Sequence, residues 1–176
     1  MRRACQSPPR SSTSLPTAGA TWLCWDTLSA FKDEPEDNGD AFLLWEGRIP
    51  EGDGVPQHSE HNHEAFYVLE GILEIEADGV RHRLRPGDFL CIQPGVLHSL
   101  HNPGPGWLRS LMIVSPGSQH VRFFMTLGQP LVDPANPPPP PGPPDFERFA
   151  SVARENGIDF APPPGHREPQ RQRNPT

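Results

Sequence analysis

Short apolar runs separated by turn residues follow one another from about residue 22 to residue 115. The runs are TWLCW, AFLLWEGRI, EAFYVLE, ILEIEA, VRHRL, DFLCI, HSLHN and WLRSLMIV. Short strands at this spacing, with Gly, Pro and Asp between them, predict an all-β sandwich or barrel. Asp78 and Gly79 join two of these runs, and they are the strongest hairpin signal because a type I′ turn needs positive φ at both positions.

The spacing of apolar residues changes after Gly117. A short helix with a glycine C-cap is predicted by QHVRFFMTLG, which ends at Gly128. A stiff, extended linker is expected from DPANPPPPPGPP, since proline interrupts both helix and strand. A second, amphipathic helix is predicted by DFERFASVARENG, which has an Asp N-cap, apolar residues at helical spacing and an Asn-Gly stop.

The chain has 176 residues, which is enough for one domain with a sizeable core. Of its 25 prolines, 14 lie from Pro130 onward, so we expect the core upstream of that point. The predicted organisation is a disordered N-terminal tail (1–20), a β-barrel domain (21–128), a proline-rich linker (129–144), a C-terminal helix (145–157) and a disordered tail (158–176).

Charge and cysteine content exclude several classes of function. The net charge of -7 argues against nucleic acid and anionic membranes as partners, because both attract basic surfaces. No apolar run approaches the length that spans a bilayer. The three cysteines form no CxxC pair, which disfavours a disulfide scaffold or a zinc ribbon and favours a reducing cytoplasm.

Candidate chemistry begins in HSEHNHEAFYVLEG, residues 58–71. In an extended chain His58 and Glu60 point to the same face, because side chains alternate. Glu64 opens the next strand after a short turn and can point back to the same pocket, and His98 follows the turn QPGVL. Two imidazoles and two carboxylates of this kind suit Fe(II), Mn(II) or another divalent transition metal with open coordination positions.

Two sets of residues recur at motif spacing: Gly52, His58, Glu64 and Gly71 in the first, and Gly87, Gly95, His98 and Asn102 in the second. With these motifs the chain resembles the cupin superfamily, and in particular its single-domain members described as quercetin 2,3-dioxygenase-like. Gln93 stands at the proline position of the second motif. The resemblance covers roughly residues 20–160. It implies an all-β cupin (RmlC-like) double-stranded β-helix, or jelly-roll barrel, with short C-terminal helices.

One position departs from the first motif, because Glu60 stands where the family has its second histidine. The resemblance carries metal-ligand roles to His58, Glu64 and His98, and it leaves Glu60 as a fourth candidate ligand. Four such ligands would cancel the charge of a divalent ion, and the carboxylates favour Fe(II) or Mn(II), with Ni(II) as a further candidate. Without Glu60, two histidines and one carboxylate remain. His61 or His63 could substitute only if the turn bulges.

The resemblance implies an enzyme, a metal-dependent dioxygenase or related oxidoreductase that acts on a small aromatic or flavonol-like substrate in the barrel. Glu64 would be the general base, or Glu60 if it does not coordinate the metal. The alternatives are a non-catalytic small-molecule-binding cupin and a cupin isomerase or cyclase. The expected partners are a small-molecule substrate and a second copy of the chain. A homodimer would form by exchange of a strand around residues 22–26 or by burial of the C-terminal helix.

Overall fold

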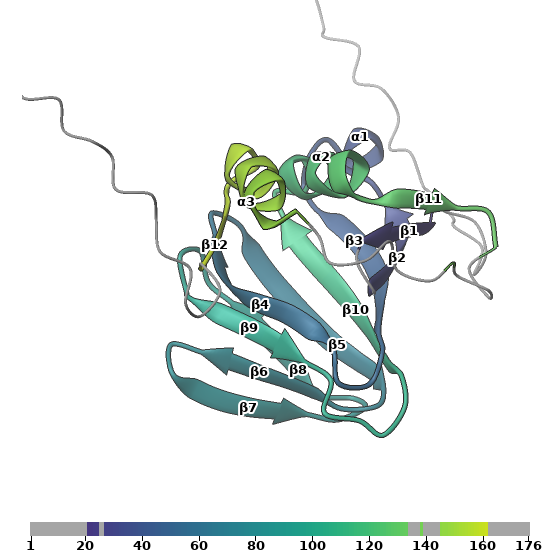
Figure 1. Ribbon diagram of the computed structural model, residues 1–176, viewed down its shortest axis with the longest axis vertical. Helices are drawn as coiled ribbons and strands as arrows, with labels where there is room; N and C mark the ends of the chain where they lie inside the picture. The colour runs from purple at the N-terminus through teal and green to yellow at the C-terminus, as the bar shows by residue number, and fades with distance from the viewer. Residues whose placement is uncertain (1–20, 25–26, 134–137, 139–144, 162–176) are drawn as a thin grey trace, which may run out of the picture.

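The computed structural model of this protein describes residues 21–24, 27–133, 138 and 145–161. Within them, two antiparallel sheets lie face to face (Figure 1). The larger sheet contains seven described strands, in the order β11 (Gln129–Leu131), β1 (Thr21–Cys24), β2 (Thr27–Asp33), β3 (Leu43–Ile49), β10 (Leu108–Ser115), β5 (His63–Glu70) and β8 (Phe89–Ile92). The smaller sheet contains five, in the order β12 (Ile158–Phe160), β4 (Gly54–Glu60), β9 (His98–His101), β6 (Leu73–Ala77) and β7 (Val80–Leu84). This is the all-β jelly roll, or double-stranded β-helix, that the sequence predicts.

The core lies between the two sheets and comes from alternate residues of the strands. Every second residue of β10 from Leu108 to Val114 is buried, and β3 alternates in the same way from Leu43 to Ile49. Since successive side chains of a strand point to opposite faces, one face of each strand supplies the core. The largest apolar side chains that are fully buried are Phe31, Phe66, Leu43, Ile49, Leu73, Ile75 and Leu108.

Each of the eight predicted runs contains a strand, and the predicted hairpin joins β6 to β7. At its turn Asp78 has φ of 47° and Gly79 has φ of 77°, as a type I′ turn requires. Strand β4 is not among the predicted runs, and neither is β2. The burial of β2 does not alternate regularly, because a register shift after Phe31 interrupts its pairing with β3 and a buried serine, Ser29, stands among its apolar residues.

Three helices among the described residues, α1 (Pro35–Asn38), α2 (Ser118–Leu127) and α3 (Phe146–Glu155), lie at one end of the sandwich (Figure 1). The two predicted helices correspond to α2 and α3. Asp145 caps α3 as expected, since its side chain accepts a hydrogen bond from the backbone N–H of Arg148 at 3.1 Å. The helices pack on each other through Phe123 and Phe149, whose ring centroids are 5.6 Å apart.

Two short strands correct the predicted boundaries. Residues 129–131, at the start of the predicted linker, form β11 and pair with β1. Residues 158–160, assigned to the disordered tail, form β12 and pair with β4, so that Phe160 lies opposite His58. Strands of three residues are too short to show a period of two in the sequence, and each exists because a neighbouring strand offers unpaired backbone groups.

The predicted tails at 1–20 and 162–176 and most of the proline run lie outside the described residues, and of the second tail only residues 158–161 are described. None of the described helices is long and apolar enough to cross a membrane.

Candidate metal centre

Three strands bring His58, Glu64 and His98 together inside the barrel. His58 on β4 lies directly opposite His98 on β9, and Glu64 comes from β5 in the facing sheet. One ligand atom from each residue lies within 4.8 Å of the ligand atoms of the other two, and all three residues are buried. We refer to His58, Glu64 and His98 as the ligand triad. It joins three of the four residues that the sequence singles out.

The backbone orients both histidines of the ligand triad in the same way. Nδ1 of His58 lies 2.8 Å from the carbonyl oxygen of Pro56, and Nδ1 of His98 lies 2.9 Å from that of Val96. A carbonyl oxygen only accepts, so each Nδ1 carries the proton and donates it. In each neutral imidazole the lone pair is then on Nε2, which is the tautomer that a metal-binding histidine requires.

Glu64 and His98 form a buried pair, with Oε2 of Glu64 3.0 Å from Nε2 of His98. Burial, reinforced by the charge of Glu60, raises the pKa of Glu64. Burial by itself would lower the pKa of His98, but contact with Glu64 outweighs it and raises that pKa. The pair therefore retains one proton over a wide pH range, at the position where a metal ion would compete with it.

His58 behaves differently because no carboxylate touches it in the described structure. Burial, followed by the nearby His98, lowers its pKa to about 4, so its imidazole is neutral at physiological pH. The ring of Phe160 stacks on it, with centroids 4.9 Å apart and planes 20° from parallel. Strand β12 thus covers one side of the ligand triad with an aromatic ring.

Glu60 points to the same side of β4 as His58, as predicted, but it lies outside the ligand triad. Its Oε2 is 2.9 Å from Nε2 of His120 on α2, and both residues are buried. Burial would raise the pKa of Glu60, but His120 outweighs it and lowers that pKa; in the same way Glu60 raises the pKa of His120. The two residues form an ion pair beside the ligand triad.

Comparison with known proteins agrees with this geometry. The model of the Cupin domain matches residues 45–114. The chain is also similar to the quercetin 2,3-dioxygenase of Bacillus subtilis (strain 168), with 28% identity over 138 residues that make up 72% of this chain and 40% of that protein. Residues 45–114 of this chain therefore form a cupin domain. This cupin spans about two fifths of the length of its Bacillus relative.

Solved structures support the same fold at low sequence identity. KdgF from Halomonas sp. superposes with a TM-score of 0.56 at 16% identity, over 64% of this chain and 99% of that one. An RmlC-like cupin from Shewanella frigidimarina NCIMB 400 gives a TM-score of 0.56 at 17% identity, over 64% and 96% of the two chains. At these identities the similarity defines the fold alone.

The remaining motif positions of this cupin have structural roles. Asn102 is buried and stabilises a loop: its Nδ2 donates to the carbonyls of Ile49 and Gly106, and its Oδ1 accepts from the N–H of Gly104.

His61 and His63 are exposed, so the alternative in which they replace Glu60 is not realised. The alternation of side chains along the two strands already disfavours it.

His120 is the residue of this site that sequence reasoning missed, because a lone histidine is most often a surface or hydrogen-bonding residue. The sequence does hold a signal for it. His120 and Phe124 are four residues apart and lie with Phe123 on the buried face of α2, whereas Arg122 and Thr126 are exposed. A histidine on the apolar stripe of a helix has to find a polar partner inside the protein, and Glu60 is that partner.

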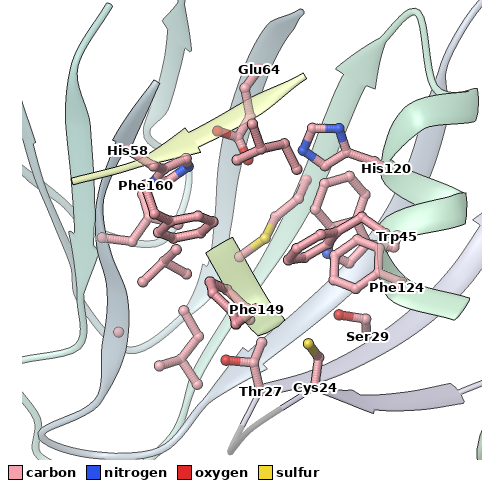
Figure 2. A pocket seen from close by; sticks show the side chains of 17 residues that line it. Cys24, Thr27, Ser29, Trp45, His58, Glu64, His120, Phe124, Phe149 and Phe160 are labelled. Atoms are coloured by element: carbon pink, nitrogen blue, oxygen red, sulfur yellow. The ribbon is translucent and has the colours of Figure 1, made fainter. Parts of the chain in front are cut away.

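A cavity of about 80 Å³ leads from the ligand triad into the core of this cupin (Figure 2). His58, Glu64 and His120 line one end of it. Its walls are largely apolar, and they include five aromatic residues: Trp45, Phe123, Phe124, Phe149 and Phe160. Two buried imidazoles and a buried carboxylate at the head of an apolar cavity can hold a divalent metal, with room on one side for a small ligand.

Proposed function

We propose that this cupin is a metal-dependent oxidoreductase, an oxygenase that acts on a small aromatic or flavonol-like compound in its barrel. One observation carries the proposal: the ligand triad is buried at the head of a cavity with aromatic walls. The similarity to a quercetin 2,3-dioxygenase over 72% of the chain supports the same reaction class. An apolar cavity binds and orients a planar ring, and it excludes bulk water from the reacting atoms.

Iron or manganese is the metal we propose, and nickel is a further candidate. Two neutral imidazoles and one carboxylate are the donor set found for Fe(II) in many oxygenases, and no thiolate is present in the ligand triad to favour zinc or copper. A bound metal with open positions supplies Lewis acidity and access to O₂ chemistry.

The residues of the chain have separable roles in this proposal. His58 and His98 present their Nε2 lone pairs, because the backbone carbonyls of Pro56 and Val96 hold the Nδ1 protons. Glu64 shares a proton with His98 when the metal is absent, and its second carboxylate oxygen is available as a base for a substrate hydroxyl. Glu60 is held by His120 and is not a ligand in this proposal.

A binding protein without turnover is the second candidate, and Glu60 is the observation that favours it. Because a carboxylate replaces the motif histidine, the site has one imidazole fewer than the family's ligand set. Its metal could then serve to hold a ligand instead of activating it. An isomerase or cyclase would use the same residues with no consumption of O₂.

Oxygen uptake tests the proposal. The protein would be reconstituted with Fe(II) or Mn(II) and mixed with a panel of catechols and flavonols in an oxygen electrode. We expect O₂ consumption that depends on both metal and aromatic compound, and that Glu64→Gln abolishes. Stoichiometric metal with no uptake for any compound would overturn the oxygenase and would favour the binding protein. O₂ consumption that persists in Glu64→Gln would show that the reaction does not depend on the ligand triad.

The homodimer remains a prediction. In the single chain, β1 pairs with β2 and β11, and α3 packs on α2, so neither element is free to be exchanged without losing contacts of its own. Light scattering of the purified protein would give the mass in solution.

A further inference from the structure

The cavity has two polar ends. Figure 2 places Glu64, His58 and His120 at one end and Cys24, Thr27 and Ser29 at the other, with aromatic rings between them. The first end contains two members of the ligand triad. None of the described residues at the second end belongs to the ligand triad, so their polar groups need a separate explanation.

Ser29 is the key residue of this distal end. Its side chain lies on β2 opposite Gly47 and is 0% exposed, and its Oγ has no hydrogen-bond partner among the described residues. Buried hydroxyl groups are nearly always hydrogen-bonded, because an unpaired one loses its contacts with water and gains nothing in return. Ser29 lines the cavity, so an atom inside the cavity is the partner it lacks.

A second buried serine provides a comparison. Ser110 on β10 belongs to the same sheet and is also 0% exposed, but its Oγ lies 3.0 Å from the carbonyl oxygen of Tyr67 and 3.1 Å from that of Leu111. Ser110 does not line the cavity. Of these two serines in the larger sheet, only the one that faces the cavity is left without a partner among the described residues.

The distal end carries no formal charge among the described residues that line it. Thr27 and Ser29 contribute neutral hydroxyl groups. Burial raises the pKa of the Cys24 thiol to about 11, so that thiol is neutral and a weak nucleophile. A neutral lining without a cationic partner disfavours a carboxylate at this end, because a buried charge needs an opposite charge or several hydrogen bonds. The group that reaches Ser29 is therefore a hydroxyl, carbonyl or amide.

The size of the cavity limits the rest of the ligand. Pockets for drug-sized molecules measure roughly 300–1,000 Å³, whereas this cavity is about 80 Å³. Phe149 from α3 and Phe160 from β12 form part of its walls, and their rings pack edge to face with centroids 4.7 Å apart. The C-terminal segment thus fills space that a three-ring flavonol would need.

We propose that the cavity is a binding site for a single-ring aromatic compound, with its metal-binding group at His58 and Glu64 and a neutral polar substituent bound to Ser29 Oγ at the far end. Ser29 is then a specificity-determining residue, and Phe149 and Phe160 set the size limit. The proposal rests on the proposed function for the identity of the metal-binding end.

Matched ligands and a matched variant test this site. The protein would be loaded with Zn(II), which has no redox chemistry, and titrated calorimetrically without air. The probes are 4-(hydroxymethyl)catechol and 4-(2-hydroxyethyl)catechol, 4-methylcatechol and 4-ethylcatechol as their counterparts without the hydroxyl, and quercetin. Ser29→Ala would be compared with Ser110→Ala, and circular dichroism would establish that each variant is folded.

We expect one of the hydroxyl-bearing probes to bind roughly fivefold more tightly than its counterpart, which is the size of one neutral hydrogen bond. Ser29→Ala should remove that preference, Ser110→Ala should keep it, and quercetin should not bind. Phe160→Ala should admit quercetin. The proposal is overturned if no catechol binds, if the preference survives in Ser29→Ala, or if quercetin binds the unaltered protein; a preference absent from the outset would mean that Ser29 holds only water.

The ligand contact and the metal function can fail separately. Metal content is measured before the titrations on the same protein. A chain that binds no metal but still distinguishes the hydroxyl-bearing probe through Ser29 would refute the proposed oxygenase and keep the distal site. A chain that binds metal and catechols with no preference that depends on Ser29 would refute the distal site and leave the proposed oxygenase standing.

Discussion

Two carboxylate–imidazole pairs lie side by side in this barrel, and they differ in almost everything except the distance that joins them. Glu64 and His98 are 3.0 Å apart, and Glu60 and His120 are 2.9 Å apart, in both cases from Oε2 to Nε2. The first pair bridges two facing sheets and adjoins His58. The second pair connects a strand to helix α2.

The difference between the pairs is in what surrounds them. Nδ1 of His98 is bound to a backbone carbonyl, whereas Nδ1 of His120 has no partner among the described residues. The pKa of Glu64 is raised and that of Glu60 is lowered, so the first pair holds a shared proton while the second is ionised. A carboxylate beside a histidine therefore becomes a metal site only where a third ligand and an oriented imidazole are added.

Replacing each carboxylate by an amide should give the largest difference between the two pairs, and the difference should appear in metal affinity. Glu64→Gln removes a ligand, and we expect metal affinity to fall by more than roughly 100-fold, beyond the loss that supporting residues usually cause. Glu60→Gln should change metal affinity by less than about tenfold, because Glu60 lies outside the ligand triad. Competition titrations with a chromophoric chelator measure both. Equal losses in the two variants would make Glu60 a ligand.

Removing His120 should affect stability more than metal binding. His120→Leu leaves the buried Glu60 without its counter-charge, and we expect the free energy of unfolding to fall by about 3 kcal/mol. Replacing both residues by leucine should recover most of that loss, since no charge then remains buried. Chemical denaturation in the presence of a chelator measures each variant. A single variant as stable as the unaltered protein would show that water or solvent already neutralises Glu60.

Metal affinity should rise with pH. The pKa of His98 lies above its ordinary value of 6.5, and a metal must displace the proton that His98 shares with Glu64. Between about pH 5.5 and 6.5 that proton is bound, so affinity should increase about tenfold per pH unit. His58, with a pKa of about 4, is already neutral there and does not contribute. An affinity that stays flat across this range would exclude the shared proton.

The two buried serines should give the smallest effect. Ser110→Ala removes a hydroxyl whose single proton is donated to the backbone carbonyls of Tyr67 and Leu111, and it should cost about 1 kcal/mol of unfolding free energy. Ser29→Ala removes an unpaired hydroxyl and should be neutral or slightly stabilising in the absence of ligand. Thermal unfolding of the ligand-free protein compares the two. A loss for Ser29→Ala as large as that for Ser110→Ala would mean that Ser29 has a partner in solution.

Much of the fold follows from local pattern, because each strand of the barrel is short and ends in a turn. Eight of the twelve described strands, the turn at Asp78 and Gly79 and the two C-terminal helices are predicted from short apolar runs, positive φ and capping. Alternation also puts His58 and Glu60 on one face correctly. Strand β12 could not be predicted, since its existence depends on the free edge of β4 and not on its own three residues.

The partners of the site residues could not be predicted in the same way. His58 and Glu64 lie on consecutive strands of the two facing sheets, and His98 lies on the strand that pairs with β4, so motif and structure agree. Glu60 meets His120 across 60 positions of sequence, on a helix whose packing is decided by the tertiary structure. Ser29 shows no motif at all, and its significance appears only when its burial and its missing partner are known.

The content of bound metal tests the central claim most directly. The protein would be purified without chelators or a histidine tag, reconstituted with Fe(II) or Mn(II), desalted and analysed for metal per chain, together with His98→Gln. We predict about one ion per chain for the unaltered protein and almost none for the variant. Absence of metal from the unaltered protein after reconstitution would contradict the claim that His58, Glu64 and His98 form a metal site.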